Sequence, residues 1–199
     1  MRFEEIERGM DVTHEEPLGL RAEKSVLKFL ERNHNVFEDV TGTPKYGEND
    51  MRHIDIQARL KGLPCAIDVS GATGKRREDK ARMEGAMPFS SLHDERGRAV
   101  SGPMPHFTLQ VDLGYWGRDP DIEGMSQTDI DNKEKEFLRQ MLLQVAKIER
   151  ELSYKRRETQ PYRCALVDKT VALSNRSKGL FKEEEIETLV RLFGQGCNN

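Results

Sequence analysis

Hydrophobic and polar residues alternate with a changing period along the first third of this chain. Over residues 18–32 the apolar positions recur at intervals of three and four, which is the spacing of a helix face. A short strand is expected at 36–40, and residues 52–60 then alternate strictly between apolar and polar, as a half-buried strand does. Lys61-Gly62 suits a tight turn before a returning strand at 63–70. The pattern therefore predicts a helix, a strand and a β-hairpin.

The rest of the chain is expected to alternate between helices, strands and polar loops. In order, the expected elements are a charged helix at 75–87, a long loop at 88–105, a strand at 106–113, irregular chain at 114–124, a long helix at 128–157, a buried strand at 164–167 and a final helix at 182–193. Residues 1–16 are expected to form an acidic arm or a short helix. Strands and helices in this order predict an α/β fold, with a mixed sheet and helices on both faces.

The composition argues against a membrane protein and against a secreted, disulfide-rich protein. Charged residues make up 34% of the 199 residues, against roughly 25% in an average domain. The sequence has no apolar run long enough to span a membrane, and its N-terminal residues are too acidic and polar for a secretory signal to be expected. Cys65, Cys164 and Cys197 are scattered and odd in number, and the five histidines lack zinc-site spacing. We therefore expect a cytoplasmic protein with reduced thiols and no membrane partner.

The net charge limits how this chain could contact nucleic acid. It is -3 at pH 7 with a pI near 6.0, whereas proteins that coat nucleic acid non-specifically are usually basic overall. Any such contact must use a local basic patch or a bound cation.

Two aspartates are expected to meet on the hairpin. If Lys61-Gly62 is the turn, Leu60 faces Leu63, and the same register places Asp55 opposite Asp68 on the polar face. Two like charges so placed destabilise a hairpin, and a hard divalent cation such as Mg²⁺ between them removes the cost. The alternative is a hairpin whose acids point into solvent.

Glu23 interrupts an otherwise apolar helix face. It precedes Val26, Leu27 and Leu30 by three, four and seven residues. A charge buried there is costly unless it is paired or bound to metal. The alternative is that Glu23 lies at the edge of the stripe and extends to water.

A basic run follows the second hairpin strand. Its cationic residues could neutralise phosphates; they are Lys75, Arg76, Arg77, Lys80 and Arg82. Acids stand between them, so a solvated helix with charge pairs would have the same sequence.

Together these features resemble the PD-(D/E)xK nuclease superfamily, which includes restriction endonucleases and archaeal Holliday-junction resolvases. The matching residues are Glu23 in the leading helix, Asp55 in Ile54-Asp55-Ile56, and Asp68 two residues before Ser70. The resemblance covers residues 17–113 and implies an α/β, restriction-endonuclease-like αβββαβ core with a mixed sheet. Residues 114–199 would be a mostly helical C-terminal extension of the same single domain, 1–199.

The resemblance also implies a function, a cofactor and roles for the site residues. Mg²⁺ or Mn²⁺ would be held by Asp55 and Asp68, with Glu23 and the main-chain carbonyl of Val69 as further ligands. The reaction would be hydrolysis of phosphodiester bonds, in DNA in preference to RNA.

The chain departs from the family pattern at two places. No proline precedes Asp55, and Ser70 stands where the family has its lysine. Lys75 or Lys80 could act as a substitute catalytic lysine. Without one, the chain would be a catalytically inactive nuclease-fold protein that binds nucleic acid or protein.

The predicted long helix carries one apolar stripe with alternating three- and four-residue spacing: Leu138, Met141, Val145, Ile148 and Leu152. Packing on the chain's own core is expected, since a coiled coil needs more heptads. The alternative is the seam of a homodimer.

Overall fold

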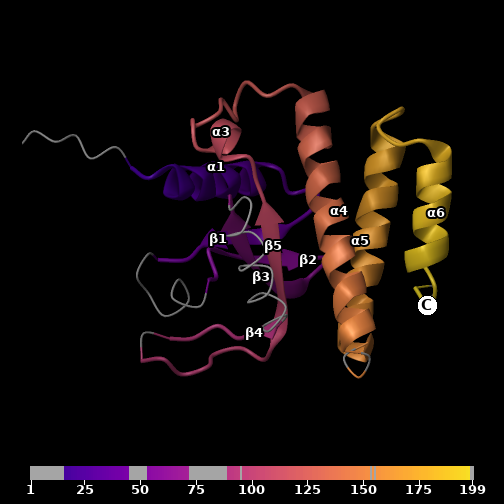
Figure 1. Cartoon of the computed structure of the whole chain (residues 1–199), viewed down its shortest axis with the longest axis horizontal. Helices are drawn as coiled ribbons and strands as arrows, with labels where there is room; N and C mark the ends of the chain where they lie inside the picture. The colour runs from indigo at the N-terminus through magenta and orange to yellow at the C-terminus, as the bar shows by residue number, and fades with distance from the viewer. Residues whose placement is uncertain are drawn as a thin grey trace, which may run out of the picture.

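A mixed sheet is the centre of the fold in this computed structural model, which describes residues 16–44, 53–71, 89–94, 96–152, 154 and 156–197 (Figure 1). The strands are β1 Glu38–Gly42, β2 Ile56–Leu60, β3 Leu63–Ser70, β4 Phe89–Ser90 and β5 Met104–Gln110. They lie in the order β1-β2-β3-β5-β4, with β3 and β5 parallel and the other neighbours antiparallel. The protein is therefore α/β with a five-stranded mixed sheet, as the sequence predicts.

The β2–β3 hairpin has the predicted turn and register. Lys61 and Gly62 have φ angles of 50° and 77°, the left-handed values found at both positions of a type I′ hairpin turn. Leu60 pairs with Leu63, and the ladder continues in register to Ile56 opposite Ile67.

The helices with four or more described residues are α1 Leu18–Arg32, α3 Leu113–Trp116, α4 Gln127–Glu151, α5 Arg156–Arg176 and α6 Glu183–Phe193. Apolar residues of α1, α4 and α5 share one core with the face of β3 that carries Cys65, Ile67 and Val69. Figure 1 shows α4 beside β5, with α5 next to α4 and α6 next to α5. Leu138, Met141 and Val145 of the predicted stripe are buried in this core, so the prediction that the stripe packs on its own chain is confirmed.

Several predicted elements differ from the structure. The expected strand at 164–167 lies inside α5, because a short apolar run has no period that separates a strand from a buried helix. The expected helix at 128–157 is two helices, since α4 ends at Glu151 and α5 begins at Arg156. The expected loop at 88–105 contains β4, and the short helix α3 begins where the strand 106–113 was expected to end. The expected arm at 1–16 is described only at residue 16, and the expected helix at 75–87 lies outside the described residues.

A charge network with two buried carboxylates joins α4 to α5. Arg176 donates to Asp131 at 2.8 Å and to Glu134 at 2.5 Å, and Asn35 donates to Glu134 at 2.9 Å. Asp131 and Glu134 are 5% and 1% exposed. Burial alone would raise the pKa of Asp131, but hydrogen bonds from Ser177, Gln127 and Arg176 outweigh it and lower the pKa. The network therefore holds the start of α4 against the end of α5.

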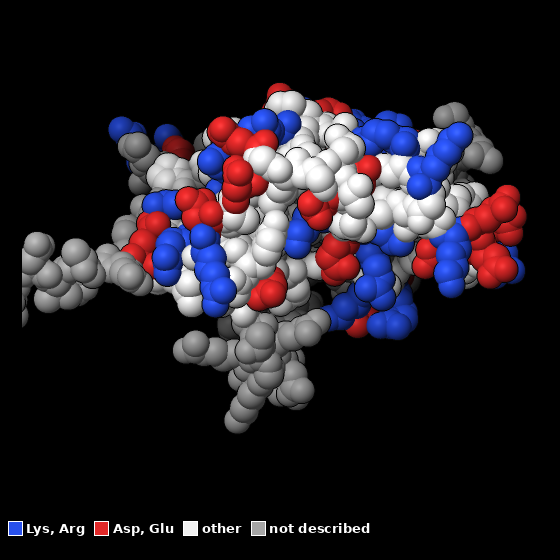
Figure 2. Space-filling view, turned by 90° about the horizontal axis from the view of Figure 1, so that it is seen from above, with Lys and Arg blue, Asp and Glu red and all other residues white. Residues whose placement is uncertain are grey.

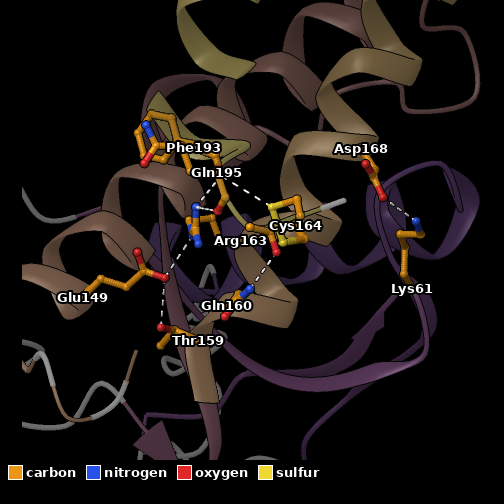
Figure 3. The surroundings of a disulfide bond; sticks show 11 residues. Lys61, Glu149, Thr159, Gln160, Arg163, Cys164, Asp168, Phe193 and Gln195 are labelled. Atoms are coloured by element: carbon orange, nitrogen blue, oxygen red, sulfur yellow. Dashed lines mark hydrogen bonds and ion pairs between the residues drawn. A yellow bond between two sulfur atoms is a disulfide. The ribbon is translucent and has the colours of Figure 1, made fainter. Parts of the chain in front are cut away.

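The expectation of three reduced thiols is wrong, because Cys164 and Cys197 form a disulfide (Figure 3). The turn between α5 and α6 brings their Cα atoms to 5.2 Å although 33 residues separate them in sequence. Beside the disulfide, Arg163 donates to the main-chain carbonyls of Phe193 and Gln195 and to Glu149. The end of the described chain is thus tied to α5. Cys65 is free and buried, and burial raises its pKa to about 12.

Across the described ranges, none of the helices has both the length and the apolar character that crossing a bilayer would require.

Candidate metal-binding site on the β2–β3 hairpin

Asp68 lies in the middle of the sheet. It is on β3, pairs with Thr108 of the parallel strand β5, and is 3% exposed. Its atom Oδ2 is out of contact with solvent. A carboxylate in such a place is costly unless hydrogen bonds or a cation compensate the lost hydration. Asp68 is therefore a carboxylate held away from water in the centre of the sheet.

Asp55 lies at a β-bulge rather than opposite Asp68. The N–H of Asp55 donates to the carbonyl of Ile67 at 2.9 Å, although the regular partner of Ile67 is Ile56. Two residues of one strand thus face one residue of the other, which is the definition of a bulge. The expected pairing of Asp55 directly across from Asp68 is therefore not formed, because the ladder is interrupted at this residue.

The bulge turns the Asp55 carboxylate back onto β3. The N–H of Val69 donates to Asp55 Oδ2 at 2.7 Å, where a regular ladder would use the main-chain carbonyl of Ile54. The Ile54 carbonyl instead accepts from the Thr43 hydroxyl, and the Thr43 N–H donates to the Asp55 carbonyl at 2.8 Å. The Asp55 carboxylate consequently lies against the main chain of the residue next to Asp68.

Glu23 on α1 is partly buried. Its Oε2 is out of contact with solvent, while its neighbours Ala22 and Val26 belong to the core. Glu23 therefore lies at the edge of the apolar stripe, with one carboxylate oxygen turned away from water. Among the described residues, no three His, Cys, Asp or Glu side chains gather as a set of metal ligands, so the structure does not bring Glu23 into one group with Asp55 and Asp68.

The position where the nuclease superfamily has its lysine is occupied by a buried serine. Ser70 is 2% exposed at the end of β3. The expected substitutes Lys75 and Lys80 lie outside the described residues, as do the expected phosphate contacts Arg76, Arg77 and Arg82.

The potential ligand atoms on the hairpin are of the type that a hard divalent cation prefers. Asp55, Asp68 and the main-chain carbonyl of Val69 offer oxygen only, which Mg²⁺ and Mn²⁺ prefer. Mg²⁺ sites commonly use one or two carboxylates and complete the shell with water. A pair of carboxylates is therefore enough for such a site.

A histidine not selected from the sequence lies on the same face of the sheet. His106 pairs with Ala66 on β3, two residues before Asp68, and contacts Ser90 and the main chain of His53. Alternation along β5 puts His106 on one face of the sheet and the apolar Phe107 on the other. Nothing local in the sequence indicates that His106 contacts Ser90 and His53.

Charges on the visible surface do not form one continuous basic area. Figure 2 shows Lys and Arg interspersed with Asp and Glu, with acidic side chains gathered at the end of the molecule where α6 lies. The first turn of α6 supplies Glu183, Glu184 and Glu185. A nucleic-acid contact on this face would need a cation to offset the acids.

Comparisons with known proteins give no relative. No family model matches the chain, and no curated protein or solved structure matches it.

Proposed function

We propose that this protein is a metal-dependent nuclease that hydrolyses phosphodiester bonds, in DNA rather than RNA, with a restriction-endonuclease-like core. One observation carries the proposal: the Asp55 carboxylate accepts from the N–H of Val69, next to the buried Asp68. Asp55 and Asp68 therefore lie on adjoining segments of the hairpin, which supports their assignment to one cation that prefers carboxylate oxygens.

The arrangement of the strands is compatible with the proposed core. An acid-bearing helix leads into an antiparallel β1–β2–β3 meander, and β3 lies parallel to β5. The two aspartates lie where β2 and β3 separate. This placement supports the assignment of Asp55 and Asp68 to the metal, with the Val69 carbonyl as a candidate further ligand. Glu23 would have to move towards the two aspartates to join them.

The proposed roles divide between the cation and the chain. A bound Mg²⁺ or Mn²⁺ would lower the pKa of a coordinated water and stabilise charge on the scissile phosphate. Asp55 and Asp68 would hold the cation, and the main-chain hydrogen bonds of Asp55 would keep its carboxylate in place. Lys75 or Lys80 is the proposed catalytic lysine, while Arg76, Arg77 and Arg82 would contact the phosphates.

The test is cleavage of single-stranded, duplex and branched DNA, and of RNA, with Mg²⁺ or Mn²⁺. Asp68→Asn keeps the shape and removes the charge, so turnover should fall by orders of magnitude. Asp168→Asn, on an exposed part of α5, is the matched control and should cut like the parent. Lys75→Ala and Lys80→Ala identify the lysine: a catalytic lysine lowers turnover, whereas a phosphate contact mainly weakens binding.

A parent protein that cuts none of these substrates, or an Asp68→Asn variant that cuts as fast, would overturn the nuclease proposal. The alternative is then a catalytically inactive protein of this fold that binds nucleic acid or protein. Ser70 in place of the family's lysine is the observation that favours it.

A further inference from the structure

The hydrogen bonds of His106 define its tautomer. Its Nε2 lies 3.0 Å from the His53 carbonyl oxygen, and its Nδ1 lies 2.7 Å from Ser90 Oγ. A carbonyl only accepts, so Nε2 carries the proton and donates to His53. In the neutral ring Nδ1 is then the acceptor, and the Ser90 hydroxyl donates to it. Ser90 is buried, so this pair is a fixed part of the fold.

His106 acts on a strained part of the main chain. His53 has φ 60°, a conformation that residues with a side chain rarely adopt and that its surroundings must maintain. The next residue, Ile54, packs with Ala66 and Met104 on the Asp68 face, whereas Ile56 belongs to the core on the other face. The segment from His53 to Ile56 therefore changes sides of the sheet at the bulge, and Asp55 lies at the crossing.

We infer that His106 is a positioning residue for Asp55, acting through the carbonyl of His53, with Ser90 holding the imidazole in the donating tautomer. The inference rests on the proposed function, because it assigns Asp55 to the metal. His106 fixes the chain two residues before Asp55, and Thr43 fixes it at Ile54 and Asp55. With both anchors, the Asp55 carboxylate stays on the N–H of Val69.

The N–H of Val69 reports directly on the position of the carboxylate. Amide hydrogen exchange of the full chain, followed residue by residue by NMR, should show Val69 exchanging about tenfold faster in His106→Ala, the scale of one lost hydrogen bond. Amides near the turn, such as that of Cys65, should be unchanged. His106→Gln can place an N–H donor near the position of Nε2 and should restore most of the protection, whereas the shorter His106→Asn should not. His93→Ala removes a different imidazole, which contacts the main-chain carbonyl of Ser91, and should behave like the parent.

Mn²⁺ titration by calorimetry on the same variants tests whether the position of the Asp55 carboxylate affects metal binding. His106→Ala should bind Mn²⁺ about 10- to 100-fold more weakly, the usual cost of losing a group that orients a metal ligand, and His106→Gln should bind nearly as tightly as the parent. Unchanged Val69 exchange or unchanged Mn²⁺ affinity in a folded His106→Ala would overturn the inference. If His106→Ala does not fold, equal protection of Val69 in His106→Gln and His106→Asn would overturn it.

Failure of the proposed function has a different signature. A parent that binds no Mn²⁺ removes the metal site, and with it the role assigned to His106 there. Faster Val69 exchange in His106→Ala would still show that His106 positions Asp55.

Discussion

The side-chain amide of Gln144 on α4 pairs with both main-chain groups of Thr108 on β5, accepting from its N–H and donating to its carbonyl, each at 2.8 Å. Gln140, one helical turn earlier, makes the same two bonds with Gln110. Beyond the short β4 strand, α4 thus takes the place of a neighbouring strand along β5. Main-chain groups that would form an open sheet edge are satisfied, and α4 is fixed beside the strand that borders Asp68.

Removal of this amide should lower the free energy of unfolding. Gln144→Ala leaves two main-chain groups of Thr108 without their partner and should cost about 1–3 kcal/mol, measured by urea unfolding. Gln144→Glu can still accept from the N–H but cannot donate to the carbonyl, so its cost should reflect the lost donor. Arg139→Ala, on the exposed side of the same helix, should change stability by less than about 0.5 kcal/mol. Equal stability of Gln144→Ala and the parent would show that α4 does not support this edge.

The disulfide should contribute strongly to the stability of the C-terminal helices. Cys164 and Cys197 close a loop of sequence separation 33, and the chain-entropy relation gives about 3–4 kcal/mol for a loop of that size. Cys197→Ser should lower the free energy of unfolding by about this amount, and a reducing agent should do the same to the parent. A reducing agent should have no further effect on Cys197→Ser. Thiol counting on the folded parent checks the pairing: Cys65 alone should be free, and burial should make it slow to react.

Acid should weaken the α4–α5 junction. The pKa of Asp131 is lowered from the ordinary value of 3.8 by the hydrogen bonds that outweigh its burial. A depressed pKa in the folded state contributes stability above the ordinary value, and that contribution is lost as pH falls below 3.8. The difference in unfolding free energy between the parent and Asp131→Asn should therefore be largest at neutral pH and shrink as pH falls below this value. A difference that stays constant with pH would contradict the assignment.

Local patterns predicted the parts of the fold that are decided locally. Helix α1 and strand β3 have the predicted bounds, because each has a recognisable period and a clear end. The hairpin register followed from the Lys61-Gly62 turn. The bulge at Asp55 did not, because Thr43, just after β1, and His106, on β5, contact this segment from distant parts of the sequence. The alternation of apolar and polar residues predicted that the regular ladder continues to Asp55, but tertiary contacts interrupt it there.

Other features needed contacts that the sequence does not display. The Cys164–Cys197 disulfide depends on how α6 folds back on α5, and composition alone favoured reduced thiols. Asp131 and Glu134 were within reach of sequence reasoning, since they continue the three- and four-residue spacing of Leu138 and Val145. The argument that made Glu23 conspicuous, an acid on an apolar stripe, applies to both of them.

Binding of Mn²⁺ should stabilise the parent through the two aspartates. A ligand that binds only the folded state raises the free energy of unfolding by about 2.7 kcal/mol at a concentration 100 times its Kd. The unfolding temperature of the parent should therefore rise as Mn²⁺ is added, and Mg²⁺ should have the same effect at higher concentration if its affinity is lower. Asp68→Asn and Asp55→Asn should lose this rise, because an amide oxygen is a poorer ligand for a hard cation than a carboxylate. Asp168→Asn, which loses an exposed carboxylate on α5, should keep it. An Asp68→Asn variant that Mn²⁺ stabilises as much as the parent would place the cation elsewhere, and the hairpin would no longer be the site.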